Sequence, residues 1–433
     1  MPAIVVIGGQ WGDEGKGRVI DLAASKAQVV ARYSAGNNAG HTVVNELGEF
    51  SLHLVPAGIF YPDKTCVIGN GLVIDPGLLL EEIQGLEARG IRVQGRLFVS
   101  DRAHVTMPWH PIIDHLDEEL RGKAAIGTTG RGVGPAFADK VGRLGIRLAD
   151  LLDADGLRRR LELVVPYKNA VLSRLYGNSE SLDVDDIHRQ YVAYGESLTP
   201  YICDTATLVQ DALAEGQTVL LEGAQGALLD LDLGTYEYVT SSVPSSLAGG
   251  ACVGVGIGPT QITSVVGVYK SYITRVGNGP MPTELLGEDG SRLREHGPRP
   301  EYGATTGRPR RCGWFDGVAS RYTARANALT AAVLTRLDVL DQFETIKVCT
   351  AYEIGGKVSD RFPADLSLLQ SARPVYEELP GWGSDTSGVR RFEDLPPTAR
   401  DYVHRIEQIL CAPIRLVSVG PERDQAIPRG DFL

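Results

Sequence analysis

The sequence predicts an α/β protein: a mostly parallel central sheet with a P-loop-like N-terminus, a helical insertion and a C-terminal α+β section. Three observations predict this fold class. The chain opens with an apolar run, a glycine-rich loop and an amphipathic stretch; its middle carries leucines at helical spacing; and strand-like runs return afterwards. The 433 residues are 43% hydrophobic and 22% charged, an ordinary globular composition that excludes a disordered chain and a disulfide scaffold.

The first elements form a β–loop–α–β unit. Residues 3–7 (AIVVI) are wholly apolar and predict a buried strand. A glycine-rich loop leads into an amphipathic stretch from Lys16 to Lys26, which predicts a helix, and residues 29–33 predict the second strand. A unit of this kind opens a parallel sheet.

The remaining elements divide the chain into three parts. Leucines at helical spacing between Pro111 and Leu198 predict the helical insertion, and a helix over residues 78–89 is expected to end at Gly90. Further strands are expected at residues 65–68, 97–100, 218–221, 265–269, 346–350 and 414–417. We therefore expect a central α/β body at residues 1–100 and 204–265, a helical insertion at 101–203 and a C-terminal section at 266–433.

Charge and cysteine usage exclude several classes of protein. A net charge of −11 is unfavourable for sequence-independent binding to nucleic acid. No apolar run approaches the ~20 residues that cross a membrane, and the first nine residues lack the basic region of a signal peptide. The six cysteines are scattered without a Cys-x-x-Cys pair, which favours reduced thiols and a cytoplasmic location over a zinc site.

The strongest functional signal is the loop at residues 8–18 (GGQWGDEGKGR), between a strand and a helix. Its backbone N–H groups and the helix N-terminus can cradle phosphates, and Lys16 can neutralise them. The spacing differs from the standard P-loop, because Gly17 stands where a Ser or Thr would bind magnesium. Asp13 can ligate a metal or act as a base instead. The alternative is a turn whose glycines serve packing, which the lysine and the paired acids disfavour.

A second loop, at residues 36–42 (GNNAGHT), follows the second predicted strand. Loops after neighbouring parallel strands meet at the carboxyl edge of the sheet. We therefore expect His41 to lie near Asp13, where the two side chains form an acid–base pair.

Five more segments carry polar side chains that suit a ligand. Residues 126–135 and 303–313 combine hydroxyls with arginines, which suits an anion, although each can also be a solvated loop. Gln225 follows a strand and can hydrogen-bond a base edge. Asp338 can accept both the ring N–H and the exocyclic amine of guanine, and the segment at Ser418 follows the last strand.

A histidine group at His104, His110 and His115, with Asp114, has spacings that suggest a metal site. Pro111 and the helical stretch beyond it favour surface and helix-start residues instead.

Together these segments resemble the adenylosuccinate synthetase family. The resemblance runs from Gly9 to Pro421 and includes the motifs GQWGDEGKG, NNAGHT, IGNG, GTTGRGVGP, EGAQG, GTYEYVTSS, TTGRPRRCGWFD and SVGP in the family's order. It implies a cytoplasmic ligase of purine biosynthesis that joins IMP and L-aspartate with GTP and one Mg²⁺ per subunit. The products are adenylosuccinate, GDP and phosphate, in the first committed step from IMP to AMP.

The resemblance also implies a mechanism through 6-phosphoryl-IMP. Asp13 takes the proton from the ring nitrogen beside the 6-oxygen, His41 acts as acid on the transferring phosphate, and Gln225 stabilises charge on the 6-oxygen. Asp13 and the Gly40 carbonyl hold the magnesium. The aspartate amine then displaces the phosphate.

The resemblance further implies three binding sets and a homodimer. GTP is expected at Gly12, Asp13, Glu14, Gly15, Lys16, Gly17, Arg18, Gly40, His41, Thr42, Arg336, Leu337, Asp338, Ser418, Val419 and Gly420. IMP is expected at Asp13, Lys16, Asn38, His41, Thr129, Gln225, Thr240 and Arg308, with Arg143 contributed by the partner subunit. Aspartate is expected at Ala304, Thr305, Thr306, Gly307, Arg308, Pro309 and Arg310.

The chain departs from the family where Arg18 and Arg336 replace lysine and where Pro309 interrupts the arginine loop. Two alternatives remain at this point. One is a non-catalytic GTP-binding regulatory module, which needs the phosphate loop and Asp338 but not His41 or Gln225. The other is a different ligase that activates a carbonyl by phosphorylation.

Overall fold

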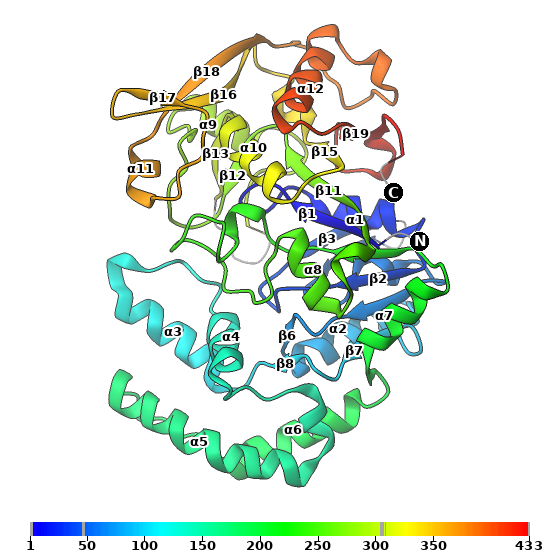
Figure 1. The fold of residues 1–433 in the computed structure, drawn as a ribbon, viewed down its shortest axis with the longest axis vertical. Helices are drawn as coiled ribbons and strands as arrows, with labels where there is room; N and C mark the ends of the chain where they lie inside the picture. The colour runs from blue at the N-terminus through cyan, green and yellow to red at the C-terminus, as the bar shows by residue number, and fades with distance from the viewer. Residues whose placement is uncertain (1–2, 46–47, 304–306, 308, 432–433) are drawn as a thin grey trace.

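The computed structural model describes residues 3–45, 48–303, 307 and 309–431. Within these ranges a ten-stranded sheet forms the centre of the molecule (Figure 1). Its strands, in spatial order, are β20 (Ala426–Pro428), β19 (Ile414–Ser418), β15 (Ala331–Thr335), β11 (Ile262–Lys270), β1 (Ala3–Gly8), β10 (Val219–Glu222), β2 (Val29–Arg32), β5 (Thr65–Ile68), β7 (Leu97–Ser100) and β9 (Ile202–Cys203).

Every neighbouring pair in this sheet is parallel except β19 and β20. The first strand, β1, lies between β10 and β11, where the order of the strands reverses. Ligands of open α/β sheets bind outside the carboxyl ends of the strands at such a switch point. The glycine loop after β1 therefore begins at the expected position for a ligand.

The β1 strand is buried on both faces, which explains its unbroken apolar sequence. Val5 and its alternate neighbours pack against α7 (Thr205–Ala214) and α8 (Ala248–Val255). Val6 points to the other face, which α1 (Lys16–Ala24) covers. The predicted first helix and first two strands are confirmed, and Gly90 follows the end of α2 (Pro76–Ala88) with a positive φ of 81°.

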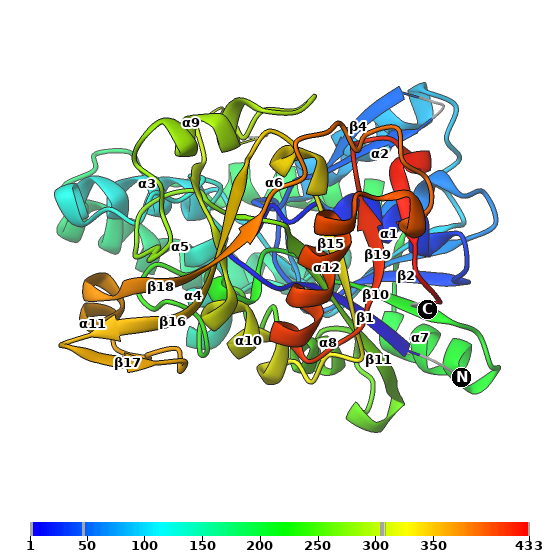
Figure 2. The same cartoon turned by 90° about the horizontal axis from the view of Figure 1, so that it is seen from above.

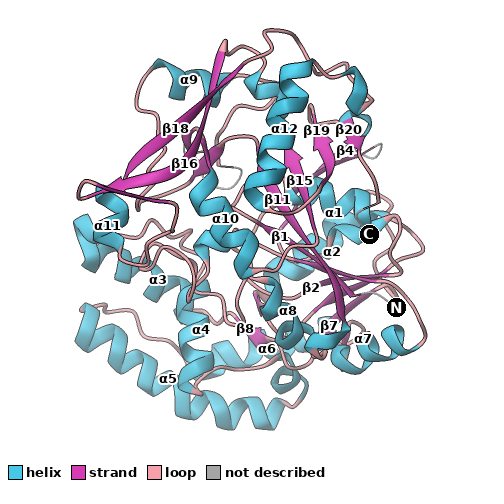
Figure 3. Ribbon diagram, turned by 45° about the horizontal axis from the view of Figure 1, so that its top comes forward, coloured by secondary structure: helices cyan, strands magenta, loops and turns pink. Residues whose placement is uncertain are grey.

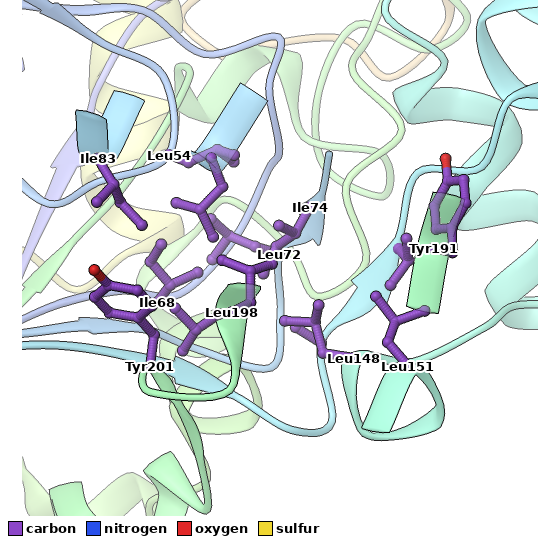
Figure 4. Close-up of a cluster of buried hydrophobic side chains, with 14 of the residues drawn as sticks. Leu54, Ile68, Leu72, Ile74, Ile83, Leu148, Leu151, Tyr191, Leu198 and Tyr201 are labelled. Carbon is purple, nitrogen blue, oxygen red and sulfur yellow. The ribbon is translucent and has the colours of Figure 1, made fainter. Parts of the chain in front are cut away.

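The helical insertion lies below the sheet in Figure 1 and is joined to it by a shared core. Its helices are α3 (Trp109–Arg121), α4 (Val133–Gly142), α5 (Ala154–Tyr176) and α6 (Val184–Leu198). Figure 4 shows this core, in which Ile68 of β5 and Leu198 of α6 belong to one cluster of buried side chains. The insertion is thus packed firmly onto the body rather than tethered to it.

The C-terminal section adds a second sheet, which Figures 2 and 3 show at one side of the molecule. The expected strand at residues 346–350 lies there and not in the central sheet. The elements of this section outside the central sheet are β12 (Ile273–Arg275), α9 (Glu288–Glu295), β13 (Arg311–Gly313), β14 (Phe315–Asp316), α10 (Gly317–Ala326), β16 (Thr345–Ile354), β17 (Lys357–Ser359), α11 (Leu366–Ser371), β18 (Arg373–Pro380) and α12 (Pro397–Leu410).

Two short pairings complete the described elements. One is the hairpin β3 (His41–Asn45) and β4 (Gly48–Leu52), and the other joins β6 (Val73–Ile74) and β8 (His104–Val105). The division into three parts stays a prediction, and the central sheet crosses the expected boundary at residue 266 because β15, β19 and β20 belong to it. Over the described ranges no helix is long and apolar enough to cross a membrane.

Candidate active site

A cavity of about 1260 Å³ lies where the loops at the carboxyl edge of the sheet meet the insertion. The loops after β1, β2, β10, β15 and β19 all contribute to its wall. The wall includes the following residues that the sequence predicts as ligands: Gly12, Asp13, Gly15, Lys16, Gly17, Arg18, Asn38, Gly40, Thr129, Gln225, Thr240, Arg310, Arg336, Ser418 and Gly420. Loops as distant in sequence as those after β1 and β19 thus share one cavity.

The glycine loop after β1 is shaped by the buried carboxylate of Glu14. One oxygen of Glu14 accepts the backbone N–H groups of Gln10 at 3.0 Å and Gly12 at 2.9 Å, and the other accepts Lys16 Nζ at 2.6 Å. Asp13 has a positive φ of 58°, and its side chain remains 38% exposed. The two acids therefore differ in position: Glu14 is enclosed by the loop, whereas Asp13 lines the cavity.

The loop after β2 brings Asn38 and Gly40 to the same wall. His53 Nδ1 donates to the Ala39 carbonyl at 2.7 Å and fixes this turn. His41 begins β3 directly after Gly40, and the side chains of His41 and Thr42 lie outside the described part of the structure. The predicted acid–base pair consequently stays a prediction.

Gln225 follows β10 with a positive φ of 60°. Its side-chain oxygen accepts the hydroxyls of Thr240 at 2.7 Å and Ser242 at 3.2 Å. Because that oxygen is occupied, the amide nitrogen is the end left to donate, and this buried nitrogen has no partner among the described residues. A buried amide donor at the cavity wall suits an oxygen atom of a ligand.

The arginine loop is described in part, since Ala304, Thr305, Thr306 and Arg308 lie outside the described residues. Gly307 N–H donates to the Gly303 carbonyl at 2.8 Å, and Pro309 forms a bridge with Tyr302. Arg310 reaches into the cavity, where its Nε donates to Asp13 Oδ2 at 2.7 Å. The structure thus joins the arginine loop to the glycine loop.

The opposite end of the cavity lies between β15 and β19. Asp338 is buried just behind the wall, one of its oxygens has no partner among the described residues, and burial raises the pKa of its carboxyl. Arg18 Nη1 donates to Ser418 Oγ at 2.6 Å and also to the Gly420 carbonyl. Glu14, Leu337, Asp338 and Val419, although predicted as ligands, do not form part of the cavity wall.

The loop at residues 126–128 is held by Glu118 of α3. The Glu118 carboxylate accepts the backbone N–H groups of Ile126 at 2.9 Å, Gly127 at 2.7 Å and Thr128 at 3.1 Å. Thr129 follows this anchored turn and lines the cavity. No local pattern in the sequence indicates Glu118, because it acts eight to ten residues away in the chain.

Arg143 differs from the other arginines of the site. It caps the end of α4 with a positive φ of 62°, is exposed and is absent from the cavity wall of its own chain. Its guanidinium makes no hydrogen bond or ion pair with any described residue. Its backbone carbonyl accepts Arg160 Nη2 at 2.7 Å, so the backbone is fixed while the charged group points outside.

The residues present fit a magnesium ion that is held mainly by substrate. The described residues contain no group of three or more His, Cys, Asp or Glu side chains that could enclose a metal. Magnesium usually keeps several waters and takes one or two carboxylates together with phosphates. The half-exposed Asp13 carboxylate beside the Gly40 turn supplies a donor set of this kind.

The histidine group that suggested a metal is used in packing. His110 is buried in the first turn of α3, accepts the Met107 N–H at 2.9 Å and donates to Asp139 at 2.8 Å. His104 is also buried, and burial lowers its pKa to about 4. His110 is thus a helix-start residue, as expected, but it and His104 are buried and not at the surface, whereas His115 is exposed.

The sequence profile of the family described as adenylosuccinate synthetase matches residues 5–427. The chain belongs to the adenylosuccinate synthetase family. It is 54% identical over 431 residues to the adenylosuccinate synthetase of Heliobacterium modesticaldum, with 100% of both chains covered. It is 54% identical over 427 residues to that of Carboxydothermus hydrogenoformans, with 99% of both covered. The solved structure of fully ligated adenylosuccinate synthetase from Plasmodium falciparum has a TM-score of 0.92 and 37% identity, covering 99% of this chain and 100% of that one.

Membership of the adenylosuccinate synthetase family establishes the reaction. The enzyme is a ligase of purine biosynthesis that joins IMP and L-aspartate with GTP and Mg²⁺, and it releases adenylosuccinate, GDP and phosphate. The alternative of a non-catalytic GTP-binding module is not supported.

Proposed function

We propose that the chemical roles in the ligation are divided among separate loops at the sheet edge. The observation that carries this proposal is that Asp13 and Gln225 line one cavity, the first with a partly exposed carboxylate and the second with an amide whose nitrogen has no partner among the described residues. The base removes a proton and the amide receives the charge that this creates on the purine oxygen.

In the first step, Asp13 takes the proton from the IMP ring nitrogen, and the 6-oxygen attacks the γ-phosphorus of GTP. The bond from that phosphorus to the GDP oxygen breaks, and His41 acts as acid on the transferring phosphate. Asp13 and the Gly40 carbonyl would hold magnesium, which would supply neutralisation of phosphate charge. The amide of Gln225 stabilises the charge on the 6-oxygen.

In the second step, the aspartate amine attacks carbon 6 of the purine, and the phosphate leaves with the former 6-oxygen. Aspartate is held by Ala304, Thr305, Thr306, Gly307, Arg308, Pro309 and Arg310. IMP is held by Asp13, Lys16, Asn38, His41, Thr129, Gln225, Thr240 and Arg308. GTP is held by residues 12–18 and 40–42, with Arg336, Leu337 and Asp338 and with Ser418, Val419 and Gly420 at the guanine. The unpartnered oxygen of Asp338 supports guanine recognition.

The active enzyme is a homodimer in which Arg143 of each subunit reaches the IMP phosphate of the other. Two features support this proposal. Arg143 is exposed and has no partner among the residues that the structure describes, and α5, at the outer edge of the insertion (Figures 1 and 3), carries an apolar stripe in addition to its buried face. The stripe consists of Leu163, Tyr167, Val171 and Leu175, which recur every four residues; Leu163 and Leu175 are 65% and 62% exposed. The cytoplasmic location stays a prediction.

GDP release with different substrates tests the assignment of the reaction. The purified enzyme is given GTP and Mg²⁺ with IMP alone, with aspartate alone and with both. We expect adenylosuccinate to form with both substrates and in a one-to-one ratio with GDP. Continuous GDP release without IMP would contradict the proposal, because the 6-oxygen of IMP is the proposed acceptor of the phosphate.

A further inference from the structure

One buried carboxylate, Glu301, lies between the arginine loop and the guanine end of the cavity. Its side chain is 0% exposed. Oε2 accepts Arg310 Nη1 at 2.7 Å, and Oε1 accepts Lys270 Nζ at 2.8 Å. The Arg336 guanidinium lies 3.4 Å from Oε1, and the Tyr272 hydroxyl donates to the same oxygen. Three cations from three segments of the chain thus share one carboxylate.

The partners of Glu301 extend to both ends of the site. Arg310 uses Nη1 for Glu301 and Nε for Asp13, so its guanidinium bridges the two carboxylates. Arg336 Nη2 donates to the Arg299 carbonyl at 2.9 Å. Arg336 also lies near Asp338, because a Cβ added at Gly297 would be 3.3 Å from Arg336 Nη2 and 3.5 Å from Asp338 Oδ2. Glu301 therefore contacts one arginine at each end of the site, Arg310 and Arg336.

The charge balance requires Glu301 to be ionised. Burial by itself raises the pKa of the carboxyl, but Lys270, Arg336 and Arg310 together hold the pKa of Glu301 well below its usual range. Three cations packed this closely repel one another unless a negative charge lies between them. Loss of that charge would turn Arg310 and Arg336 away from their present positions.

We propose that Glu301 is a positioning residue that sets Arg310 for the aspartate carboxylate and Arg336 for the guanine end. The proposal rests on the roles proposed above for Arg310 and Asp338. Glu301 holds Nη1 of Arg310, while the contact of Nε with Asp13 is the one that can be exchanged when substrate and metal bind. The carboxylate of aspartate then meets a guanidinium that is already oriented, which lowers the entropic cost of binding.

The test compares Glu301→Gln with a matched control, Glu284→Gln. Glu284 also pairs with an arginine of this segment, since Arg311 Nε donates to it at 2.7 Å, but neither residue of that pair lines the cavity. We expect Glu301→Gln to raise the KM for aspartate roughly ten- to a hundred-fold and the KM for GTP in the same direction, because hydrogen bonds to charged groups are of this strength. The KM for IMP should change less than about threefold, as should all three values in the control.

A second comparison separates positioning from general loss of structure. If Glu301 acts on aspartate through Arg310, then Glu301→Gln added to Arg310→Leu should raise the KM for aspartate no further, while its effect on the KM for GTP remains. Glu301→Asp keeps the charge on a shorter side chain, so its KM for GTP should return most of the way to the wild-type value. This comparison holds even if Glu301→Gln folds poorly.

Three results would overturn the proposal. The first is an unchanged KM for aspartate in Glu301→Gln. The second is a rise in the KM for IMP equal to that for aspartate in folded Glu301→Gln or Glu301→Asp. The third is a KM for aspartate in the double variant that has risen by the product of the two single effects. Failure of the wild-type enzyme to make adenylosuccinate from IMP, aspartate and GTP would instead contradict the proposed function, and it is measured first.

Discussion

The arginines at the carboxyl edge of the central sheet differ from Arg143 of the helical insertion in what holds their side chains. At the edge, Arg18, Arg310 and Arg336 are each bound by groups of their own chain, at 2.6, 2.7 and 2.9 Å. In the insertion, Arg143 is exposed and has no partner among the described residues, next to helices that expose apolar side chains. The three arginines of the edge are therefore held within one subunit, whereas Arg143 is proposed to serve a neighbour.

Asp13→Asn changes the catalytic carboxylate at the edge of the sheet and has the largest expected effect on activity. It keeps the size of the side chain but removes the proton acceptor and a metal-ligand charge. We expect turnover to fall by roughly 10²–10⁴, the usual contribution of a general acid or base. Adenylosuccinate formation measures the loss, and circular dichroism shows whether the fold is intact. Near-normal turnover would reject the role of Asp13 as base.

Asp338→Asn tests whether the other end of the edge reads guanine. The amide can accept the ring N–H but not also the exocyclic amine, so kcat/KM for GTP should fall by about a hundred-fold, with the requirement for IMP unchanged. The amide N–H can donate to a 2-oxo group, so the variant should gain on XTP relative to GTP. A GTP efficiency equal to that of the wild type would place the guanine site elsewhere.

The pH dependence of GTP binding follows from the same carboxylate. Guanine binding needs the ionised form of Asp338, and burial raises the pKa of this group. An ordinary aspartate has a pKa of about 3.9. As the pH falls, the wild-type KM for GTP should therefore begin to rise at a higher pH than it would if Asp338 had that ordinary pKa. The Asp338→Asn variant should lack this rise, and a wild-type KM for GTP that is flat through mild acid would contradict the assignment.

Arg143→Leu probes the insertion. The lost guanidinium is proposed to face the IMP phosphate, so the KM for IMP should rise roughly ten- to a hundred-fold while the KM for GTP stays within about threefold. Arg189→Leu on α6 removes another exposed arginine of the insertion, 76% exposed and paired with Asp186, and is the matched control. Equal effects of both variants would show that the loss is one of general surface charge.

Glu118→Gln tests a residue of the insertion that acts within its own subunit, and it has the smallest expected effect on activity. Glu118 belongs to the insertion but holds a loop of its own chain, through three backbone N–H groups. Its amide analogue keeps one good acceptor, so the KM for IMP should rise only about three- to tenfold. A rise confined to GTP would show that residues 126–128 do not serve the IMP site.

The sequence predicted those parts of the fold and site whose signals are local. A buried strand is a short apolar run, as at residues 3–7, and a phosphate loop is a strand followed by glycines and a lysine, as at Lys16. These patterns follow from the chain's own neighbours, so they can be read without the structure. The same holds for Gln225, which stands directly after a strand.

The parts that sequence reasoning missed depend on contacts between distant segments. Glu301 is a single acid before the arginine loop. Its role follows from its contacts with Lys270 and Arg336, which lie at the ends of two other strands. The second sheet, formed around β16, was missed because a strand does not indicate which sheet it joins. The stripe at Leu163, Tyr167, Val171 and Leu175 has a regular spacing that could have been read as a second apolar face of α5.

Mixing Arg143→Leu with Asp13→Asn, at an IMP concentration far below the raised KM of Arg143→Leu, measures most directly whether the insertion serves a neighbour. In a mixed dimer of Arg143→Leu and Asp13→Asn, one site holds both wild-type residues and the other holds both defects. After subunit exchange between equal amounts, half of the dimers are mixed, so about one quarter of all sites, and of the wild-type activity, should return. If a tagged subunit shows that exchange occurred and no activity returns, Arg143 serves its own subunit and the account is wrong.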